Sequence, residues 1–226
     1  MKLNWAERWV VNSPMQVMKQ RIEIHWLKKM MSLEQGSMVL EIGCGRGAGA
    51  KLIFQEFQPS FLHALDLDVQ MVQAAKGYLS SEEREKISLS AGDVIRLPFR
   101  EGSIDAVFGF GVLHHVPDWR SALAQIAMVL KPGGAYFIEE IYPTLYQNMI
   151  TKQILEHPRE DRFFSDELKK ALKDVKLPFI EIMELKKLGV LGVAVKEADS
   201  EASPRRAAGH PEKDGGTRHS QISRLR

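Results

Sequence analysis

A short apolar run that leads an acidic residue directly into closely spaced glycines constrains this chain more than any other feature. Residues 39–49 read VLEIGCGRGAG, with Glu41 two positions before Gly43. Glycine permits positive φ and lets a ligand lie against bare main chain, and the N-terminus of a following helix offers unpaired N–H groups to an anion. The segment therefore predicts a turn between a strand and a helix of an α/β sheet that binds a nucleotide-like cofactor.

The glycine spacing alone leaves the ligand open. Gly43, Gly45 and Ala48 satisfy the dinucleotide fingerprint, and Asp66 could supply the acidic residue that follows about 20 positions later. A tight turn that binds nothing can carry the same glycines. An NAD-dependent oxidoreductase, another nucleotide-binding protein and a purely structural turn are all compatible with this segment.

Short β-rich runs alternate with helical runs from about Met38 to Ile141, which is typical of βαβ units with helices on both faces of a parallel sheet. Asp68 and Asp118 are predicted to cap two of the helices. The runs 179–185 and 190–195 are close enough in sequence to form an antiparallel pair. We therefore expect an α/β fold with a Rossmann-like, doubly wound, seven-stranded sheet, mostly parallel, with an antiparallel C-terminal strand.

The composition suggests three segments. Residues 1–35 are predicted to form an N-terminal helical segment, because residues 5–34 have apolar positions three and four apart and Pro14 follows Ser13. Residues 36–195 would form the ligand-binding domain. Residues 196–226 are polar and are predicted not to fold. The helical segment is interpreted as a packed helix or a lid, while its tryptophans and lysines leave contact with a membrane surface as an alternative.

Further landmarks follow the glycine turn in order. They are Asp66 at the end of FLHALD, GDVIRLPF from Gly92, GFGVLHHV from Gly109 and LKPGG from Leu130. In type and order, residues 36–141 resemble the class I S-adenosylmethionine-dependent methyltransferases, in the group that carries ExGxGxG, GDxxxLPF, LHHV and LKPGG. An oxidoreductase would leave most of these landmarks unused, and no eroded motif favours a non-catalytic methyltransferase-like partner subunit.

The resemblance implies S-adenosyl-L-methionine as cofactor and a set of contacts at the ends of the strands. The implied residues are Glu41, Gly43, Cys44 and Gly45 for the methionine portion, Asp66 for the ribose hydroxyls, and Leu67, Asp93, Val94 and Phe110 for the adenine. A carboxylate suits a diol because its two oxygens accept and the diol donates twice. Turn or cap chemistry is the alternative for Asp66 and Asp93.

The expected reaction is a direct in-line methyl transfer to a small-molecule acceptor, which the aromatic and methionine content near the site suggests is apolar or aromatic. The candidate bases are His114 and His115 after the fourth strand and Glu140 or Tyr142 after the fifth. These strands are neighbours in the resembled fold, and His114 and Glu140 are predicted to meet over the methyl group as a base and its partner. The alternative is that the histidine pair only shapes its loop. No metal site is predicted.

Composition excludes some classes of function. A net charge of +2 in 226 residues, without a basic cluster in the core, gives no reason to expect a nucleic-acid partner. No apolar run approaches the ~18 residues that cross a bilayer, and no signal-peptide layout is present. The single cysteine, Cys44, fits a reducing compartment and is expected to be a small apolar side chain rather than a reactive thiol. We expect a cytoplasmic enzyme.

Overall fold

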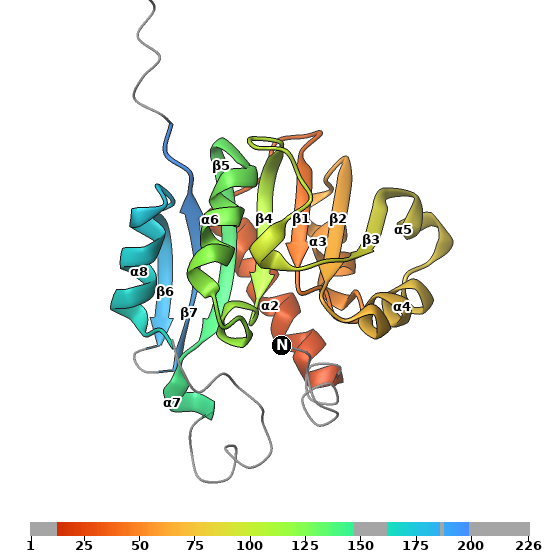
Figure 1. The fold of residues 1–226 in the computed structure, drawn as a ribbon. Helices are drawn as coiled ribbons and strands as arrows, with labels where there is room; N and C mark the ends of the chain where they lie inside the picture. The colour runs from red at the N-terminus through yellow and green to blue at the C-terminus, as the bar shows by residue number, and fades with distance from the viewer. Residues whose placement is uncertain (1–12, 147–161, 186–187, 199–226) are drawn as a thin grey trace, which may run out of the picture.

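A seven-stranded sheet forms the centre of the computed structural model, which describes residues 13–146, 162–185 and 188–198 (Figure 1). The strands are β1 (Met38–Ile42), β2 (Phe61–Asp66), β3 (Ile87–Ala91), β4 (Ile104–Phe110), β5 (Leu130–Ile141), β6 (Phe179–Leu185) and β7 (Gly189–Val195). Their order is β3-β2-β1-β4-β5-β7-β6. Strands β1 to β5 pair in parallel, and β7 pairs antiparallel with β5 and β6. The predicted fold class, strand number and antiparallel strand are confirmed.

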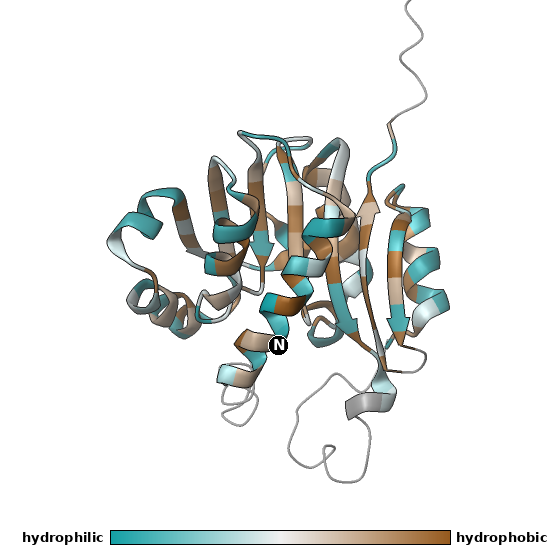
Figure 2. Ribbon diagram, turned by 180° about the vertical axis from the view of Figure 1, so that it is seen from behind, coloured by the Kyte–Doolittle hydropathy of each residue, from teal (hydrophilic) through white to brown (hydrophobic). Residues whose placement is uncertain are grey.

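Helices cover both faces of the sheet (Figures 1 and 2). The described helices are α2 (Pro14–Met30), α3 (Ala48–Phe57), α4 (Val69–Tyr78), α5 (Ser81–Lys86), α6 (Trp119–Val129), α7 (Pro143–Tyr146) and α8 (Ser165–Asp174), with short 3-10 turns η1 (Val94–Arg96) and η2 (Leu113–His115). Helices α2 and α3 lie on one face, and α6 and α8 lie on the other. This is the doubly wound arrangement that right-handed crossovers produce.

The predicted helix caps are present. The Asp68 side chain accepts a hydrogen bond from the Gln70 N–H at the start of α4, and Asp118 accepts one from the Ser121 N–H at the start of α6. These carboxylates satisfy main-chain donors that have no partner inside the helix. The caps confirm where the chain leaves the sheet edge and enters each helix.

Three local predictions differ from the structure. The N-terminal helix begins at Pro14, capped by Ser13, and ends at Met30 rather than near residue 34, while residues 5–12 of the predicted helix lie outside the described residues. The short helix α5 was not predicted from the sequence. The segment Lys131–Gly134, expected as a break after α6, belongs to β5 as an irregularity in its pairing with β4.

Apolar side chains from the two sheet faces form two cores. One contains Trp119, Leu123 and Ile126 of α6 with Leu168 and Leu172 of α8, and the other contains Ile24 and Leu27 of α2 with Ile53 and Phe57 of α3. Ile24 and Leu27 are fully buried, so α2 packs into the second core. The division at residues 35 and 195 remains a proposal, and residues 1–12 and 199–226 lie outside the described chain.

Strands β1 and β4 are neighbours at the centre of the sheet, although β2 and β3 separate them in sequence. The strand order therefore reverses between them. In open α/β sheets the crevice at such a reversal, beyond the carboxyl ends of the strands, is where ligands bind. The glycine turn follows β1 at this point, and the GFGVLHHV segment follows β4.

Candidate functional site

The turn after β1 folds back on the end of β2. The Cys44 N–H donates to the Leu65 carbonyl at 3.0 Å, and the Gly47 N–H donates to the Cys44 carbonyl at 2.9 Å. Gly43 has a φ of +66°, and a Cβ there would lie 2.6 Å from Cγ2 of Val112. Only glycine meets both conditions without strain, because L residues with side chains avoid this φ and the neighbouring loop leaves no room.

Asp66 fixes the turn at the end of β2. Its Oδ2 accepts a hydrogen bond from the Gly45 N–H at 2.8 Å, and its Oδ1 accepts one from the Asp68 N–H at 2.8 Å. A carboxylate oxygen can accept more than one hydrogen bond. The Asp66 carboxylate therefore holds the glycine turn from the cavity wall.

A cavity of about 320 Å³ opens at this edge of the sheet. Its wall is assembled from the turns after β1, β2, β3 and β4 together with one face of α2. The lining residues include Gln16, Gln20, Gly43, Cys44, Gly45, Arg46, Asp66, Leu67, Met71, Asp93, Val94, Ile95, Phe110, Val112, His115, Val116 and Pro117. This volume is within the range of pockets for small molecules, and an apolar wall with a few polar groups is typical of them.

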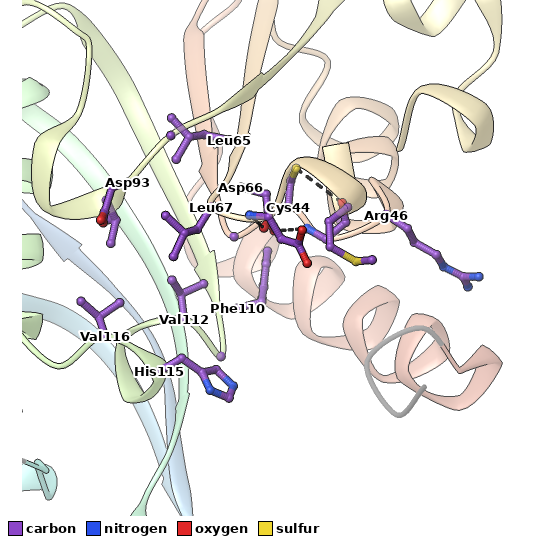
Figure 3. Close-up of a pocket in the computed structure, with 18 of the residues that line it drawn as sticks. Cys44, Arg46, Leu65, Asp66, Leu67, Asp93, Phe110, Val112, His115 and Val116 are labelled. Carbon is purple, nitrogen blue, oxygen red and sulfur yellow. Dashed lines mark hydrogen bonds between the residues drawn. The ribbon is translucent and has the colours of Figure 1, made fainter. Parts of the chain in front are cut away.

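The polar groups of the cavity lie at separate places along its wall. Figure 3 shows Asp66 and Cys44 close together, Asp93 on the far side of Leu67, and His115 beside Val112 and Val116. The Asp93 side chain also accepts a hydrogen bond from the Ile95 N–H at 3.2 Å, which caps η1. Asp66 and Asp93 thus have the turn and cap bonds considered as alternatives, and they line the cavity as well.

The predicted cofactor residues divide into two groups. Gly43, Cys44, Gly45, Asp66, Leu67, Asp93, Val94 and Phe110 line the cavity. Glu41 lies behind the wall and is 2% exposed. A Cβ on Gly49 would collide with the Glu41 carboxylate and would lie 2.7 Å from Nε2 of Gln20, so the glycine at this position provides the space that the buried carboxyl group occupies.

Burial changes the chemistry of Glu41 and Cys44. Loss of solvation, together with the nearby charge of Asp66, raises the pKa of Glu41 from 4.5 to about 8. Burial also raises the pKa of the Cys44 thiol, with the charges of Glu41 and Asp66 adding to the effect. A thiol that resists ionisation is a poor nucleophile, which favours the interpretation of Cys44 as a small apolar side chain.

The raised pKa of Glu41 predicts a pH-dependent effect of Glu41→Gln. Between pH 4.5 and about 8 the native protein holds a proton that the unfolded chain has lost, so the free energy of unfolding falls as pH rises through this range. Glutamine cannot ionise and can still accept the hydrogen bond from the Ala50 N–H. At pH 9 we expect the variant to be more stable than wild type by up to about 5 kcal/mol, at about 1.4 kcal/mol per tenfold change in acid dissociation.

Urea unfolding at pH 5 and pH 9 measures this effect. The unfolding free energies of wild type and Glu41→Gln should differ little at pH 5, where Glu41 is protonated in the native state. An equal difference at both pH values would contradict the raised pKa.

The structure brings His114 and Glu140 together, but behind the cavity wall. Nδ1 of His114 lies 2.7 Å from Oε2 of Glu140, and the two side chains are 5% and 0% exposed. Glu140 also accepts hydrogen bonds from the N–H groups of Val112 at 2.9 Å, Leu113 at 2.6 Å and His114 at 3.3 Å. The predicted meeting over the methyl group does not match this geometry, because both Glu140 oxygens are engaged in holding the turn η2. The arrangement favours a positioning role for the pair.

His115, the next residue, lines the cavity. Its ring lies against that of His114, with centroids 4.2 Å apart, and Figure 3 shows it between Val112 and the open space. The tight 3-10 turn directs consecutive histidines to different surroundings. The dipeptide is visible in the sequence, but the turn geometry that decides which ring faces the cavity is not.

Two further cavity residues were missed in the sequence. Gln16 and Gln20 of α2 line the cavity, and their spacing of four places them on the same side of the helix. Lys19 links α2 to β5 near the glutamines. Its Nζ lies 2.9 Å from Oε1 of Glu139 and 3.0 Å from Oε1 of Glu23. Burial and the charge of Glu139 raise the pKa of Glu23 to about 7. A polar pair at i and i+4 on a helix with buried apolar residues was the available signal for the glutamines.

Across residues 13–146, 162–185 and 188–198, no group of three or more His, Cys, Asp or Glu side chains is arranged to hold a metal ion. The functional groups that line the described cavity are main-chain N–H and C=O groups, carboxylates, amides, the Cys44 thiol, the Arg46 guanidinium and the His115 imidazole.

Comparison with known families identifies the domain that carries the cavity. Residues 40–138, which run from β1 to β5 and carry every predicted landmark, match the family model described as a methyltransferase domain. Residues 40–138 thus form a methyltransferase domain of the class I S-adenosylmethionine-dependent type. The glycine turn, Asp66 and Asp93, which all line the cavity, lie in the matched region.

Characterised relatives of this methyltransferase domain act on different acceptors. The chain is 36% identical over 122 residues to a demethylmenaquinone methyltransferase of Lactococcus lactis, covering 53% of the chain and 48% of the relative. It is 30% identical over 116 residues to a sterol 24-C-methyltransferase of Aspergillus fumigatus, covering 51% of the chain and 31% of the relative. The chain spans about half or less of the length of these relatives.

Solved structures show the same fold. A chain from the complex between the Trm112 methyltransferase activator of Haloferax volcanii and a methyltransferase aligns with a TM-score of 0.69 at 20% identity, covering 86% of this chain and 95% of that one. Phosphoethanolamine N-methyltransferase 2 of Haemonchus contortus, in complex with S-adenosyl-L-methionine, aligns with a TM-score of 0.66 at 18% identity. The alignment covers 80% of this chain and 53% of that one. The methyltransferase fold therefore extends beyond the matched region to β6 and β7.

Proposed function

We propose that this methyltransferase binds S-adenosyl-L-methionine in the cavity beside the glycine turn and methylates a small apolar acceptor. The observation that carries the proposal is the convergence of the Gly43–Gly45 turn and the Asp66 carboxylate on one cavity at the β1 and β4 strand ends. The family supports the cofactor, and a structural neighbour is a complex with S-adenosyl-L-methionine.

The residues present suit this cofactor. Main chain without side chains at Gly43 and Gly45 would accommodate the methionine portion, and the Asp66 carboxylate, which lines the cavity, would accept from two hydroxyls. Asp93, farther along the wall, would accept from an exocyclic amine, with Leu67 and Phe110 as apolar surfaces near it. When bound, the cofactor supplies an electrophilic methyl group on a sulfonium, so the protein has to align the acceptor and exclude water.

The wall near His115 suits an apolar acceptor. Val112, Val116 and Pro117 line the cavity on this side, and Ile95 and Met71 add further apolar surface to it. Demethylmenaquinone and sterol methyltransferases among the relatives support acceptors with a large apolar part. We place isoprenoid lipids with an ionisable hydroxyl or an activated carbon first among the candidates.

His115 is the described imidazole that can take a proton from such an acceptor. It lines the cavity, whereas His114 binds Glu140 behind the wall. We propose that His115 acts as general base and that the His114 and Glu140 pair positions the turn that carries it. Histidine is suited to this role because its ordinary pKa lies near neutral pH.

The role of His115 predicts a specific kinetic loss. His115→Ala should lower kcat by about 100-fold or more, the usual scale for loss of a general base, while the Kd of S-adenosylhomocysteine stays within about twofold. Steady-state kinetics and calorimetry measure the two quantities on the same preparation. Near-normal turnover in the variant, or weakened cofactor binding alone, would argue against a base at this position.

A methyl-transfer assay tests the proposed function. The full chain is incubated with S-adenosyl-L-methionine labelled in its methyl group and with a demethylmenaquinone, a sterol or phosphoethanolamine, and the product is separated by organic extraction. We expect label in the organic phase with an isoprenoid acceptor and none without acceptor. Hydride exchange with NAD, or cofactor binding without transfer to any acceptor, would favour the oxidoreductase or the non-catalytic subunit instead.

A further inference from the structure

Helix α2 presents an apolar stripe to solvent on the side opposite its buried residues. Met15 is 80% exposed, Met18 58% and Ile22 65%. Their spacing of three and four places them on one helix face. Exposed single apolar residues are common, but three on one face of a helix beside a pocket form a continuous surface that needs an explanation.

Basic residues continue the same face. Arg21, His25 and Lys29 are exposed and lie beside or along the line of the three apolar residues. The one acidic residue of α2, Glu23, points away from this face and pairs with Lys19. We refer to Met15, Met18, Ile22, Arg21, His25 and Lys29 as the outer stripe.

The outer stripe lies next to the cavity mouth. Gln16 and Gln20, on an adjacent side of α2, line the cavity, and the first turns of α2 extend beyond the carboxyl edge of the sheet (Figure 1). Leu67 and Ile95 of the cavity wall are themselves 41% and 39% exposed. Apolar surface is therefore exposed on two sides of the entrance.

We propose that the outer stripe docks on the surface of an anionic lipid bilayer, with α2 parallel to the membrane and the cavity mouth at the headgroups. Aliphatic side chains that enter the interface and cations that face anionic lipids are the two contributions that hold an interfacial helix on a membrane. The stripe has both and exposes no carboxylate. No described helix is both long enough and apolar enough to cross a bilayer.

The charge of the outer stripe favours an anionic bilayer over a second copy of the chain as the partner of this surface. Two outer stripes facing each other would bring Arg21, His25 and Lys29 of both copies together, which like-charge repulsion disfavours. The edge strand β6 also exposes apolar residues, with Ile180 at 52% and Leu185 at 65%, but Glu181 and Glu184 lie among them. An anionic surface would be repelled there, so β6 supplies a matched control.

Vesicle sedimentation of the full chain tests the proposal. We expect binding to phosphatidylcholine vesicles that contain phosphatidylglycerol, weaker binding without it, and weakening by salt. The double substitution M18S and I22S should lower the partition coefficient by about tenfold or more, because two apolar side chains no longer enter the interface. The control pair I180S and L185S on β6 should leave it within about twofold of wild type, the scatter expected for surface changes elsewhere.

Three results would overturn the proposal. They are no sedimentation with anionic vesicles, equal sedimentation of wild type and the M18S/I22S variant, and an equal loss in the β6 control. The proposal goes beyond the proposed function and fails separately from it, because S-adenosylhomocysteine binding by the same wild-type protein is measured without vesicles. A chain that binds the nucleoside but not the vesicle would retain its proposed activity and lose only the docking surface.

Discussion

Replacing Asp66 with alanine is expected to weaken the binding of S-adenosylhomocysteine by about a hundredfold. The substitution removes the carboxylate that we propose accepts from two ligand hydroxyls, and it leaves the Gly45 and Asp68 N–H groups, each 2.8 Å from the carboxylate, without this partner. Hydrogen bonds to a charged group contribute about 1.5 to 3 kcal/mol each, and about 2.7 kcal/mol corresponds to a hundredfold change in Kd. Isothermal titration calorimetry measures the change directly.

A conservative variant separates the two roles of Asp66, which are to hold the glycine turn and, as proposed, to accept from the ligand. Asp66→Asn keeps one oxygen that can accept from the Gly45 or Asp68 N–H, but it has lost the negative charge and one acceptor. The affinity of Asp66→Asn for S-adenosylhomocysteine should lie between those of wild type and Asp66→Ala. Unchanged affinity in both variants, with unfolding free energies equal to wild type, would remove Asp66 from the ligand site.

Replacing Glu140 with alanine is expected to destabilise the fold by about 3 to 5 kcal/mol, the cost of leaving several buried donors unpaired. The carboxylate is fully buried and binds the N–H groups of Val112, Leu113 and His114 as well as the His114 ring. Since domains of this size are stable by about 5 to 15 kcal/mol, the loss should be large in urea unfolding followed by circular dichroism.

Glu184→Ala is the control for this effect. Glu184 pairs with Lys169 at 2.7 Å and accepts from the Tyr142 hydroxyl at 3.0 Å, but its side chain is 21% exposed. A partly exposed pair of this kind contributes up to about 1 kcal/mol. If Glu140→Ala were as stable as the control and lost only turnover, Glu140 would act on the reaction itself and the positioning role would be wrong.

Local patterns in the sequence determine much of the fold. The alternation of β-rich and helical runs predicts the doubly wound sheet, and Asp68 and Asp118 mark the starts of α4 and α6 because a carboxylate before an apolar helical run satisfies the first free N–H groups. The length of the link between β6 and β7 predicts their antiparallel pairing. These features depend on residues close in sequence, so they can be recognised without the structure.

The candidate site depends more on contacts between distant segments. Glu41 has the sequence position of a ligand residue, yet packing of Gly49 and Gln20 over its carboxylate places it behind the wall. The choice between His114 and His115 follows from Glu140, 26 residues away, which holds η2 in one orientation. Gln16 and Gln20 reach the cavity because α2 docks on α3 and β7. The i and i+4 spacing of the glutamines indicates that they share a side of the helix, but the tertiary contacts that decide which side faces the cavity cannot be read from the local sequence.

The central claim is that the cavity beside the glycine turn selects a sulfur-containing nucleoside rather than a dinucleotide. Calorimetric titration of the full chain with S-adenosylhomocysteine and with NAD tests it most directly, because neither experiment needs the acceptor. The account predicts saturable one-to-one binding of S-adenosylhomocysteine and no saturable binding of NAD. Saturable binding of NAD, with no heat of binding for S-adenosylhomocysteine, would contradict it.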